Sequence, residues 1–479
     1  MPTEDYRVFR PGHFEPFEHW YPKALNATIH PLVNFFLHLQ KERIAQRYCH
    51  LHPRVSQNYL MQLLEYRPKY FLWAGADLMH VTSEHGNRHM LVIENNSCPS
   101  GQKSMPLADE HQEEGGYRLL MERTIRPYLQ SRKQVIDGAL GVVFDKNPME
   151  ASGYAASMAN TFGEPVYYAS YHASDQSRVK FEDGICMIRT GRNKWKPMRM
   201  IFRYLTQQPW NRLPVSTQTH VINPVIACLA GGRNKMLAAK AYDMYNAELA
   251  NHGLEIITPM TIWDVSKAEI PLWVRKWGGH AVIKNPYSNA GQGVWTIMNE
   301  KELNDFMQLD HRYGRFIIQS LIGNYSWSSI SEKGKFYHVG TVPNDKGKTY
   351  VADIRMMVSA TNRGIRPLSV YARRAKSPLV DQVEAGQGSW EMLGTNLSSL
   401  DENGQWQTDT NRLILTDRRD FNRLGLGLDD LIEGYIQTVL STIAIDKMAQ
   451  NLMNSQGRLK TRLFKSLDDD QVLINEILN

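Results

Sequence analysis

Apolar and polar positions follow one another along this chain in blocks that predict a mixture of strands and helices. Short apolar, β-branched and aromatic runs predict strands over 70–77, 89–94, 140–145, 164–169, 198–205, 280–284, 294–297, 315–322, 335–340, 350–358 and 365–374. Stretches in which apolar residues recur at helical spacing predict helices over 57–66, 116–132, 151–160, 234–250, 300–309 and 428–454. This mixture predicts an α/β (α+β) fold.

The order of elements over 140–169 adds detail to that prediction. A strand, a helix and a second strand follow one another there, which predicts a β-α-β unit and hence a parallel α/β lobe. The strands after residue 335 are expected to pair antiparallel. A chain of 479 residues is too long for one ordinary core, so we expect two or three lobes.

Composition narrows the class of protein. The net charge is +6, and the 55 Lys and Arg residues are interleaved with 49 Asp and Glu, so a solvated surface is a better interpretation than a nucleic-acid footprint. Four cysteines lie far apart without a CxxC pair, which argues against a disulfide framework or a zinc site. No signal-peptide pattern and no apolar run of membrane-spanning length are present. We therefore expect a cytoplasmic protein that uses no membrane and no nucleic acid.

Two predicted strands carry oxygen-bearing side chains at neighbouring ends. Asp77 ends the strand over 70–77, and Glu94-x-Asn96 ends the strand that follows it. The period of two along a strand places Glu94 and Asn96 on one face, where their oxygens can share a hard cation such as Mg²⁺. The alternative is an ordinary strand that ends in a polar turn. On the tripeptide alone this alternative is favoured, because Glu-x-Asn is a common sequence.

The stretch over 280–297 reads as a strand, a loop of small residues and a second strand. Lys284 ends the first strand, and Gly291 and Gly293 come just before the second. Glycines let backbone amides approach phosphate oxygens closely, and a lysine adds a point charge. It is not a Walker A loop, because no Gly-Lys-Ser/Thr opens a helix. Taken alone, the stretch is equally well explained as a structural turn.

From residue 234 onward the chain resembles the core of the ATP-grasp superfamily. The resemblance is carried by an ordered set: Asn-Lys235 opening a helix, Val-Ile-Lys284-Asn-Pro, Phe-Ile-Ile-Gln319, Asp353-Ile-Arg355, Tyr-Ala-Arg373-Arg374-Ala and Gly394-Thr-Asn396. The acid-ended strand and Glu-x-Asn that usually close this core lie instead at 74–101, before Pro-Ser-Gly. The chain therefore resembles a circularly permuted ATP-grasp protein, similar to glutathionylspermidine synthetase and eukaryotic glutathione synthetase. A permutation is reasonable where chain termini lie close together at a surface.

The resemblance implies a division of the chain and a set of site residues, with ATP and Mg²⁺ as cofactors. The divisions are an N-terminal region over 1–110 that carries the permuted end of the core, an α/β substrate lobe over 111–230, a nucleotide lobe over 231–325, and the remaining core with C-terminal helices over 326–479. The implied metal ligands are Asp77, Glu94 and Asn96. The implied nucleotide contacts are Lys235, Lys284, the loop Ser288, Asn289, Ala290, Gly291, Gln292 and Gly293, and the adenine-binding segment Gln319, Ser320, Leu321 and Ile322.

The remaining implied roles concern the transferred group and the substrate. Arg355, Arg374 and Asn396 are the candidates for contacts to the transferring phosphoryl group or acyl phosphate. Arg203 and Ser100 are the candidates for the carboxylate substrate, with a surface arginine as the alternative for Arg203. The chain departs from the superfamily at Gln319 and Asn289, where related proteins carry acids, and this leaves the third metal ligand open.

The resemblance implies an ATP- and Mg-dependent ligase that joins a carboxylate to an amine through an acyl phosphate. The partners would be a small-molecule or peptide carboxylate and an amine, and the protein could form a homodimer. Two alternatives remain open at this point: an ATP-grasp phosphotransferase that releases a phosphorylated acceptor, and a nucleotide-binding protein without catalytic activity. A nucleophilic role for Cys98 is less favoured than a small buried thiol.

Overall fold

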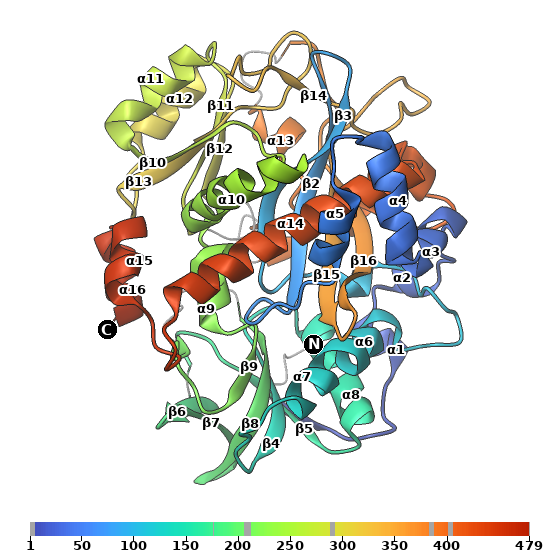
Figure 1. Ribbon diagram of the computed structural model, residues 1–479, viewed down its shortest axis with the longest axis vertical. Coiled ribbons are helices and arrows are strands. Elements are labelled where there is room, and N and C mark those ends of the chain that lie inside the picture. Colours follow the sequence, from blue (N-terminus) through green and yellow to red (C-terminus); the bar gives the residue numbers. More distant parts are fainter. Residues whose placement is uncertain are drawn as a thin grey trace.

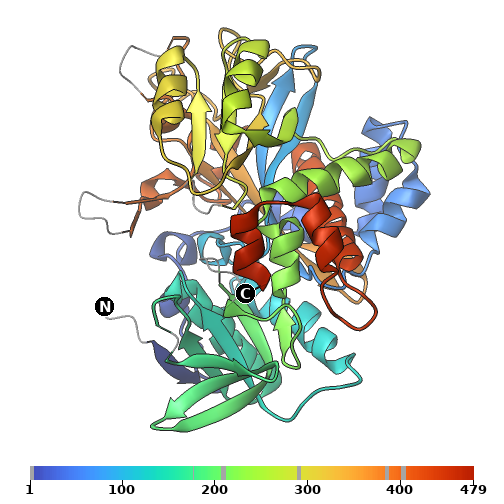
Figure 2. The same ribbon diagram turned by 90° about the vertical axis from the view of Figure 1, so that its left-hand side faces the viewer.

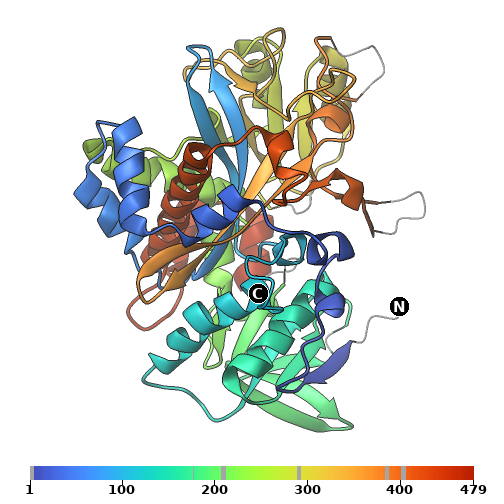
Figure 3. The ribbon, with the colours of Figure 1, turned by 90° about the vertical axis from the view of Figure 1, so that its right-hand side faces the viewer.

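The computed structural model describes residues 5–175, 177–205, 212–287, 293–382, 388–400 and 406–478. Within these ranges the chain forms the mixed α/β fold that the sequence predicts, built on three large sheets and one small one. The three large sheets are stacked along the longest axis of the molecule (Figure 1). The views from either side show the same order, with a middle layer between an upper and a lower lobe (Figures 2 and 3).

The lower lobe contains a mixed sheet, whose central strands are parallel, as the β-α-β unit predicted, and whose outer strands pair antiparallel. Its strand order is β1-β5-β4-β8-β7-β6, with β9 beside β8, and β4 pairs in parallel with both β5 and β8. Its strands are β1 (Tyr6–Phe9), β4 (Ala139–Phe144), β5 (Val166–Ser170), β6 (Val179–Glu182), β7 (Ile185–Gly191), β8 (Lys194–Tyr204) and β9 (His220–Ile222). Helices α6 (Gly115–Leu120), α7 (Arg126–Gln130) and α8 (Pro148–Phe162) pack on it, and α8 connects β4 to β5.

The middle sheet joins strands from opposite ends of the chain. Its order is β14-β2-β15-β16-β19, with β3 beside β2, and all of its pairs are antiparallel. Its strands are β2 (Trp73–Ser83), β3 (Arg88–Asn96), β14 (Phe336–His338), β15 (Ala352–Thr361), β16 (Gly364–Arg374) and β19 (Leu413–Ile414). The N-terminal hairpin β2–β3 therefore completes a sheet whose centre comes from residues after 350.

A long buried helix, α14 (Leu428–Leu452), lies across one face of this sheet (Figure 1). Its approach is close at Gly434, where an added Cβ would lie 3.0 Å from a methyl of Leu78. The N-terminal helices α3 (Pro31–His38), α4 (Lys41–Leu51) and α5 (Gln57–Leu64) pack against α14 from outside. In the described ranges, no helix combines the length and the apolar character needed to cross a membrane.

The upper lobe is a four-stranded sheet in the order β10-β13-β11-β12. Its strands are β10 (Thr261–Ser266), β11 (Ala281–Lys284), β12 (Val294–Ile297) and β13 (Arg315–Gln319). It carries helices α10 (Lys235–Leu249), α11 (Ile270–Lys276) and α12 (Glu300–Gln308). The stretch over 280–297 is thus the antiparallel hairpin that was predicted, with Lys284 paired to Val294 at the end next to its connecting loop.

The remaining elements are short and lie around the three sheets. They are α1 (Pro16–His19), α2 (Pro22–Leu25), α9 (Val225–Ala227), α13 (Trp390–Leu393), α15 (Thr461–Leu467), α16 (Gln471–Leu478) and the small sheet of β17 (Ser398–Leu400) and β18 (Trp406–Thr408). Helices α15 and α16 lie at the level where the upper and lower lobes meet (Figures 1 and 2). The predicted divisions fall at 110, 230 and 325; within the first of these regions, β1 joins the lower sheet, whereas β2 and β3 join the middle one. Those divisions stay a prediction.

Candidate functional site

A cavity of about 810 Å³ lies where the three large sheets meet. Its lining comes from β2, β3, β15 and β16 of the middle sheet, from β11, β12 and β13 of the upper sheet, and from the chain that follows β4 in the lower sheet. The loop after β3 and the segments 320–322 and 393–398 complete the wall. Most of the residues that the sequence singled out line this cavity.

Two lysines and an acid form the first cluster in the cavity. Lys284 ends β11, Lys235 opens α10, and Lys235 Nζ lies 3.6 Å from an oxygen of Glu94 on β3. Burial lowers the pKa of Lys284 to about 8, against the opposing influence of Glu94. Burial would raise the pKa of Glu94, but the charges of Lys235 and Lys284 outweigh it and lower that pKa. The cluster brings two cations and one carboxylate together at the end of β11.

The start of α10 is tied to the chain that follows β11. Lys235 N–H donates to the Pro286 carbonyl (2.8 Å), and Asn234 caps the helix by accepting from the backbone N–H groups of residues 236 and 237. Asp468, just after α15, accepts from Asn234 Nδ2 (2.9 Å) and from the Tyr287 hydroxyl (2.5 Å). Asp468 therefore links the two elements that carry Lys235 and Lys284, and no sequence motif indicated this link.

Asp77 is held by two arginines. Arg355, opposite Asp77 in the β2–β15 pair, donates to both of its oxygens at 2.5 and 2.6 Å, and Arg373 Nη2 lies 3.1 Å from it. Burial would raise the pKa of Asp77, but Arg355 and Arg373 outweigh it and hold that pKa well below its usual range. Arg373 also pairs with Asp353. The predicted catalytic Arg355 is therefore present in the cavity with its charge already compensated.

The choice between Arg373 and Arg374 changes with the structure. Successive side chains of a strand point to opposite faces of the sheet. Arg373 faces the cavity, whereas Arg374 is not among the lining residues, donates to the Ala375 carbonyl and stacks 4.6 Å from the ring centroid of Tyr350. The sequence-based assignment of Arg374 is corrected to Arg373.

The residues present offer a partial fit to Mg²⁺. Glu94 and Asn96 lie on one face of β3, and the Asn96 side-chain nitrogen donates to Glu94 (3.3 Å), which leaves the Asn96 amide oxygen for another partner. A carboxylate and an amide oxygen are suitable Mg²⁺ ligands, since this ion keeps several waters and takes phosphate oxygens as well. Asp77 faces Glu94 across the β2–β3 pair, but both of its oxygens accept from Arg355. The donor set thus fits through Glu94 and Asn96, with Asp77 engaged elsewhere.

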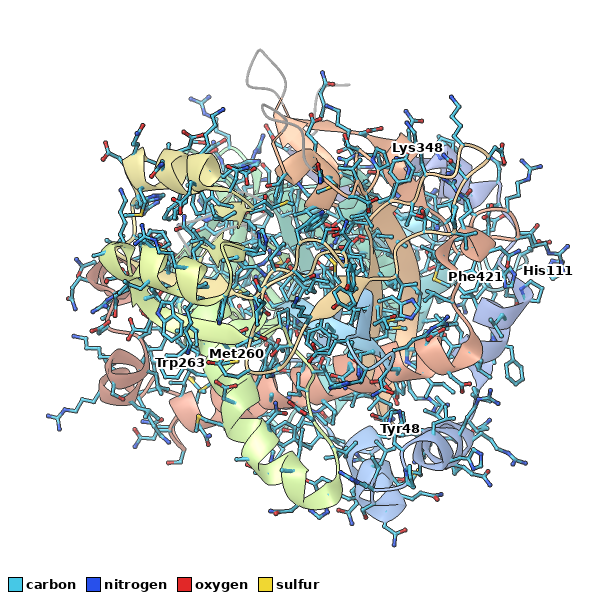
Figure 4. The ribbon with its side chains drawn as sticks, turned by 90° about the horizontal axis from the view of Figure 1, so that it is seen from above. Tyr48, His111, Met260, Trp263, Lys348 and Phe421 are labelled. Carbon is cyan, nitrogen blue, oxygen red and sulfur yellow. The ribbon has the colours of Figure 1, made fainter. Side chains whose placement is uncertain are left out.

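The segment after β13 presents backbone groups to the cavity. The Leu321 N–H donates to the Ser329 hydroxyl (2.7 Å), and the Leu321 carbonyl accepts from the Ser329 N–H (3.1 Å). The Ser320 N–H donates to the Met260 carbonyl (2.8 Å). Met260 precedes β10, and Trp263 on β10 donates from its indole N–H to the Asp243 carboxylate on α10 (3.1 Å). Met260 and Trp263 both lie beside α10 in Figure 4. Among the described residues, the Ser320 carbonyl and the Ile322 N–H make no backbone hydrogen bond. Both residues line the cavity.

The other predicted residues divide between the cavity and the core. Ser100 and Asn396 line the cavity. Arg203 does not, because it is 2% exposed and donates to the carbonyls of Asn223, Leu205 and Ser97 instead. The prediction that Arg203 faces a substrate, and the alternative that it lies on the surface, are both wrong. Cys98 is a buried thiol that donates to the Arg203 carbonyl (3.1 Å), as the sequence favoured.

Of the glycine-rich loop, Gly293 lies within the described residues. Ser288, Asn289, Ala290, Gly291 and Gln292 lie outside the described residues. Gly293 has a positive φ of 66°, and its carbonyl accepts from Asn285 N–H (2.7 Å), which closes the hairpin. An added Cβ at Gly293 would lie 2.7 Å from the Asn285 side chain, so glycine is required there for conformation and for space.

Sequence reasoning missed the cations of the lower-lobe wall. Lys103, Lys146 and Arg233 line the cavity from the loop after β3, from the end of β4 and from the chain before α10. The available signal was the position of Lys146, since ligands bind at the carboxyl ends of strands in parallel α/β sheets. Nothing in the sequence around Lys103 indicates a site.

Comparisons with known proteins give structural similarity without sequence similarity. No family model matches this chain, and no curated protein matches it. A glutathione synthetase-like effector from Globodera pallida is similar with a TM-score of 0.36 and 10% identity, over 72% of this chain and 81% of that one. A RimK domain ATP-grasp protein from Sphaerobacter thermophilus is similar with a TM-score of 0.30 and 11% identity, over 48% of this chain and 90% of that one.

A third similar structure is N5-carboxyaminoimidazole synthetase from Staphylococcus aureus complexed with ADP. Its TM-score is 0.24 and its identity 10%, over 58% of this chain and 81% of that one. TM-scores and identities this low assign neither a superfamily nor a residue role to this chain.

Proposed function

We propose that this protein is a circularly permuted ATP-grasp enzyme that uses ATP and Mg²⁺ to join a carboxylate to an amine. One observation carries the proposal. Lys235, Lys284 and Glu94, from three separate elements, converge on the cavity that is also lined by the backbone of 320–322. Cations for phosphates, a carboxylate for a metal and a backbone edge for a base are the parts that a nucleotide site needs.

Each part of the nucleotide would have its own contacts. Lys235 and Lys284 would bind phosphate oxygens as point charges. The Ser320 carbonyl would accept from an amino group of the base, and Ile322 N–H would donate to a ring nitrogen. Glu94 and Asn96 would hold Mg²⁺, whose chemistry is to offset negative charge on the phosphates. The pairing of β2 with β15 supports the permuted arrangement, since it brings Glu94 into a sheet formed by residues after 350.

The reaction would proceed in two steps. An oxygen of the acid substrate attacks the γ-phosphorus, the bond to the β–γ bridging oxygen breaks, and ADP and an acyl phosphate form. The amine then attacks the acyl carbon, inorganic phosphate leaves, and the amine loses a proton. Both steps develop negative charge on oxygens, which Arg355 and Arg373 would stabilise from the floor of the cavity. Asp77 would position these two guanidinium groups, to which it is bonded.

The proposal is tested first by ligand binding. Thermal unfolding is followed in a titration with Mg²⁺ and ATP, GTP, ADP or a non-hydrolysable ATP analogue, because a ligand that binds only the folded state raises its melting temperature. Wild type should be stabilised by Mg-ATP. Lys284→Met should bind ATP roughly 10- to 100-fold more weakly, the loss expected for a charge-assisted hydrogen bond. Lys301→Met, on the exposed face of α12, is the matched control.

A second measurement decides the reaction class. Acids and amines are screened in pairs for ADP release, and Glu94→Gln should abolish Mg²⁺-dependent turnover while the protein remains folded. ADP release that requires both an acid and an amine supports the ligase. A stable phosphorylated product formed without an amine would indicate a phosphotransferase. No melting shift with any nucleotide and no ADP release would remove the proposal.

A further inference from the structure

The lower-lobe side of the cavity holds a buried lysine without a counterion. Lys103 is 6% exposed and lines the cavity. Its ammonium lies 4.8 Å from the ring centroid of Tyr21, and to the described residues it makes neither a hydrogen bond nor an ion pair. Burial lowers the pKa of Lys103, which reflects the cost of the charge at this position. A buried ammonium that faces a cavity in this state is a strong indication of an anionic ligand.

The acid whose charge acts on Lys103 is Glu150, but it forms no ion pair with the lysine. Glu150 acts on Lys103 at a distance, but its carboxylate accepts from the backbone N–H groups of Gly101 (2.9 and 3.1 Å) and Gln102 (2.9 Å). It also accepts from the Tyr154 hydroxyl (3.4 Å). Glu150 is fully buried and holds the loop that carries Lys103 in place. Its role is therefore to fix the position of the lysine, and the cavity side of the ammonium stays open.

A second lysine faces the cavity from the end of β4. Lys146 Nζ makes one hydrogen bond, to the Cys98 carbonyl (3.1 Å), and no carboxylate of the described residues lies within ion-pair distance of it. The neighbouring Asp145 cannot serve, because it is buried and pairs with Arg212 (2.8 Å). Arg233 adds another positive charge and also donates to the Cys98 carbonyl (3.4 Å). This part of the wall is rich in cations and short of acids.

The start of α8 adds to the same positive potential. The helix has fifteen residues, and Asn147 and Pro148 at its start line the cavity. Asn147 has a positive φ of 43°, and its side chain donates to the Ser100 hydroxyl (2.6 Å) instead of capping the helix. Asparagine adopts this left-handed conformation more readily than most residues. The positive end of the helix dipole thus faces the same space as both lysines.

We propose that Lys103, Lys146 and the start of α8 form a subsite for a second anionic group of the acid substrate, a carboxylate or a phosphate. We name these three features the lysine wall. The proposal rests on the ligase function and names its substrate class: an acid with two or more negative charges. One carboxylate is activated next to Arg355, and the other anionic group binds the lysine wall. Two lysines supply point charges, which select charge more than a particular planar shape.

The test measures ligand binding at the lysine wall separately from nucleotide binding at Lys284 on the opposite side of the proposed site. Thermal unfolding is followed with glutarate, butyrate and inorganic phosphate as separate probes, and with Mg-ATP in parallel. The proteins are wild type, Lys103→Met, Lys284→Met and the surface control Lys301→Met. Glutarate should stabilise wild type more than butyrate does. Lys103→Met should weaken glutarate binding about tenfold or more while keeping the response to Mg-ATP, and Lys284→Met should do the reverse.

The outcomes are distinct. A glutarate response that survives in Lys103→Met, or that disappears in Lys284→Met instead, overturns the lysine wall and leaves the ligase proposal standing. A wild type that responds to glutarate through Lys103 but to no nucleotide shows an anion site and removes the ligase function. A phosphate response that depends on Lys103 and exceeds that of glutarate assigns the second group to a phosphate. Lys146→Gln, on a different element, repeats the test if Lys103→Met does not fold.

Discussion

The two walls of the cavity carry similar numbers of cations but treat them differently. On the upper and middle sheets, three of the cations in the cavity form ion pairs: Lys235 with Glu94, Arg355 with Asp77, and Arg373 with Asp353. The fourth, Lys284, has no ion pair among the described residues but feels the charge of Glu94. On the lower-lobe wall, Lys103 and Lys146 have no carboxylate within ion-pair distance among the described residues. The compensated wall can be stable while empty and can also hold a cation. At pH values where both lysines are charged, the uncompensated wall bears a cost that an anionic ligand would offset.

The largest change in stability is expected when an acid that pairs with the buried arginines of the upper and middle sheets, the first wall, is removed. Asp77→Asn leaves Arg355 and Arg373 buried near each other without their shared carboxylate. Removing one partner of a buried ion pair costs about 3–5 kcal/mol, so the free energy of unfolding should fall by that amount in urea titrations. Asp305→Asn, exposed on α12, is the control. Unchanged stability would show that the two arginines find other partners and that the wall is not held by compensation.

The opposite change is expected on the second wall. Lys103→Met replaces a buried, uncompensated ammonium by an apolar chain of similar length, so the unliganded protein should become more stable by about 1 kcal/mol or more. A urea titration measures this change, with Lys301→Met expected to be neutral. A destabilised Lys103→Met variant would mean that the stacking of Lys103 on Tyr21 is worth more than the burial of its charge costs. The contrast between the two walls would then be wrong.

A pH series sharpens the same contrast at Lys146. Burial, with Arg233 beside it, lowers the pKa of Lys146 to about 7 in the folded protein, whereas an unfolded lysine titrates near 10.4. Below pH 7 Lys146 is protonated in both the folded and the unfolded state, so the folded protein bears the full free-energy cost of burying its charge. Between about 7 and 10.4 the unfolded state binds a proton that the folded state lacks, so stability rises with pH.

The excess stability of Lys146→Met over wild type should therefore be largest below pH 7. Above pH 7 it should shrink, by at most about 1.4 kcal/mol per pH unit. The groups that act on Lys146 are Arg233, Arg355, Cys98 and Asp145, and its ammonium also lies 5.1 Å from the ring centroid of Tyr204. Burial raises the pKa values of Cys98 and Tyr204. Urea titrations across this range measure the difference, and an excess that does not vary with pH would place the Lys146 charge in solvent.

The first wall was largely predictable from the sequence, and the second was not. Lys284 and Glu94-x-Asn96 lie at the ends of strands that the apolar pattern predicts, and the resemblance of the ordered set of motifs, not either motif alone, was needed to propose their roles. The resemblance implied Arg374, and the sequence could not separate it from Arg373: alternation along a strand places two neighbours on opposite faces but does not show which face borders a cavity. Arg203 ends its strand as predicted, yet three backbone carbonyls from elsewhere in the fold take up its guanidinium group. The exposure of Lys103 to a cavity depends entirely on tertiary packing.

The smallest expected effect concerns the positioning of the first wall by the C-terminal segment. Asp468 accepts from both Asn234 and Tyr287, so Asp468→Ala should loosen the start of α10 relative to the approach to the 288–292 loop. Mg-ATP affinity should fall about threefold, as expected when one hydrogen-bond partner of a positioning group is lost, while glutarate binding at the lysine wall stays the same. Asp468→Asn keeps an acceptor oxygen and should restore most of the affinity. If both ligands lose affinity equally in Asp468→Ala, the residue supports the fold in general, and the two walls are not positioned independently.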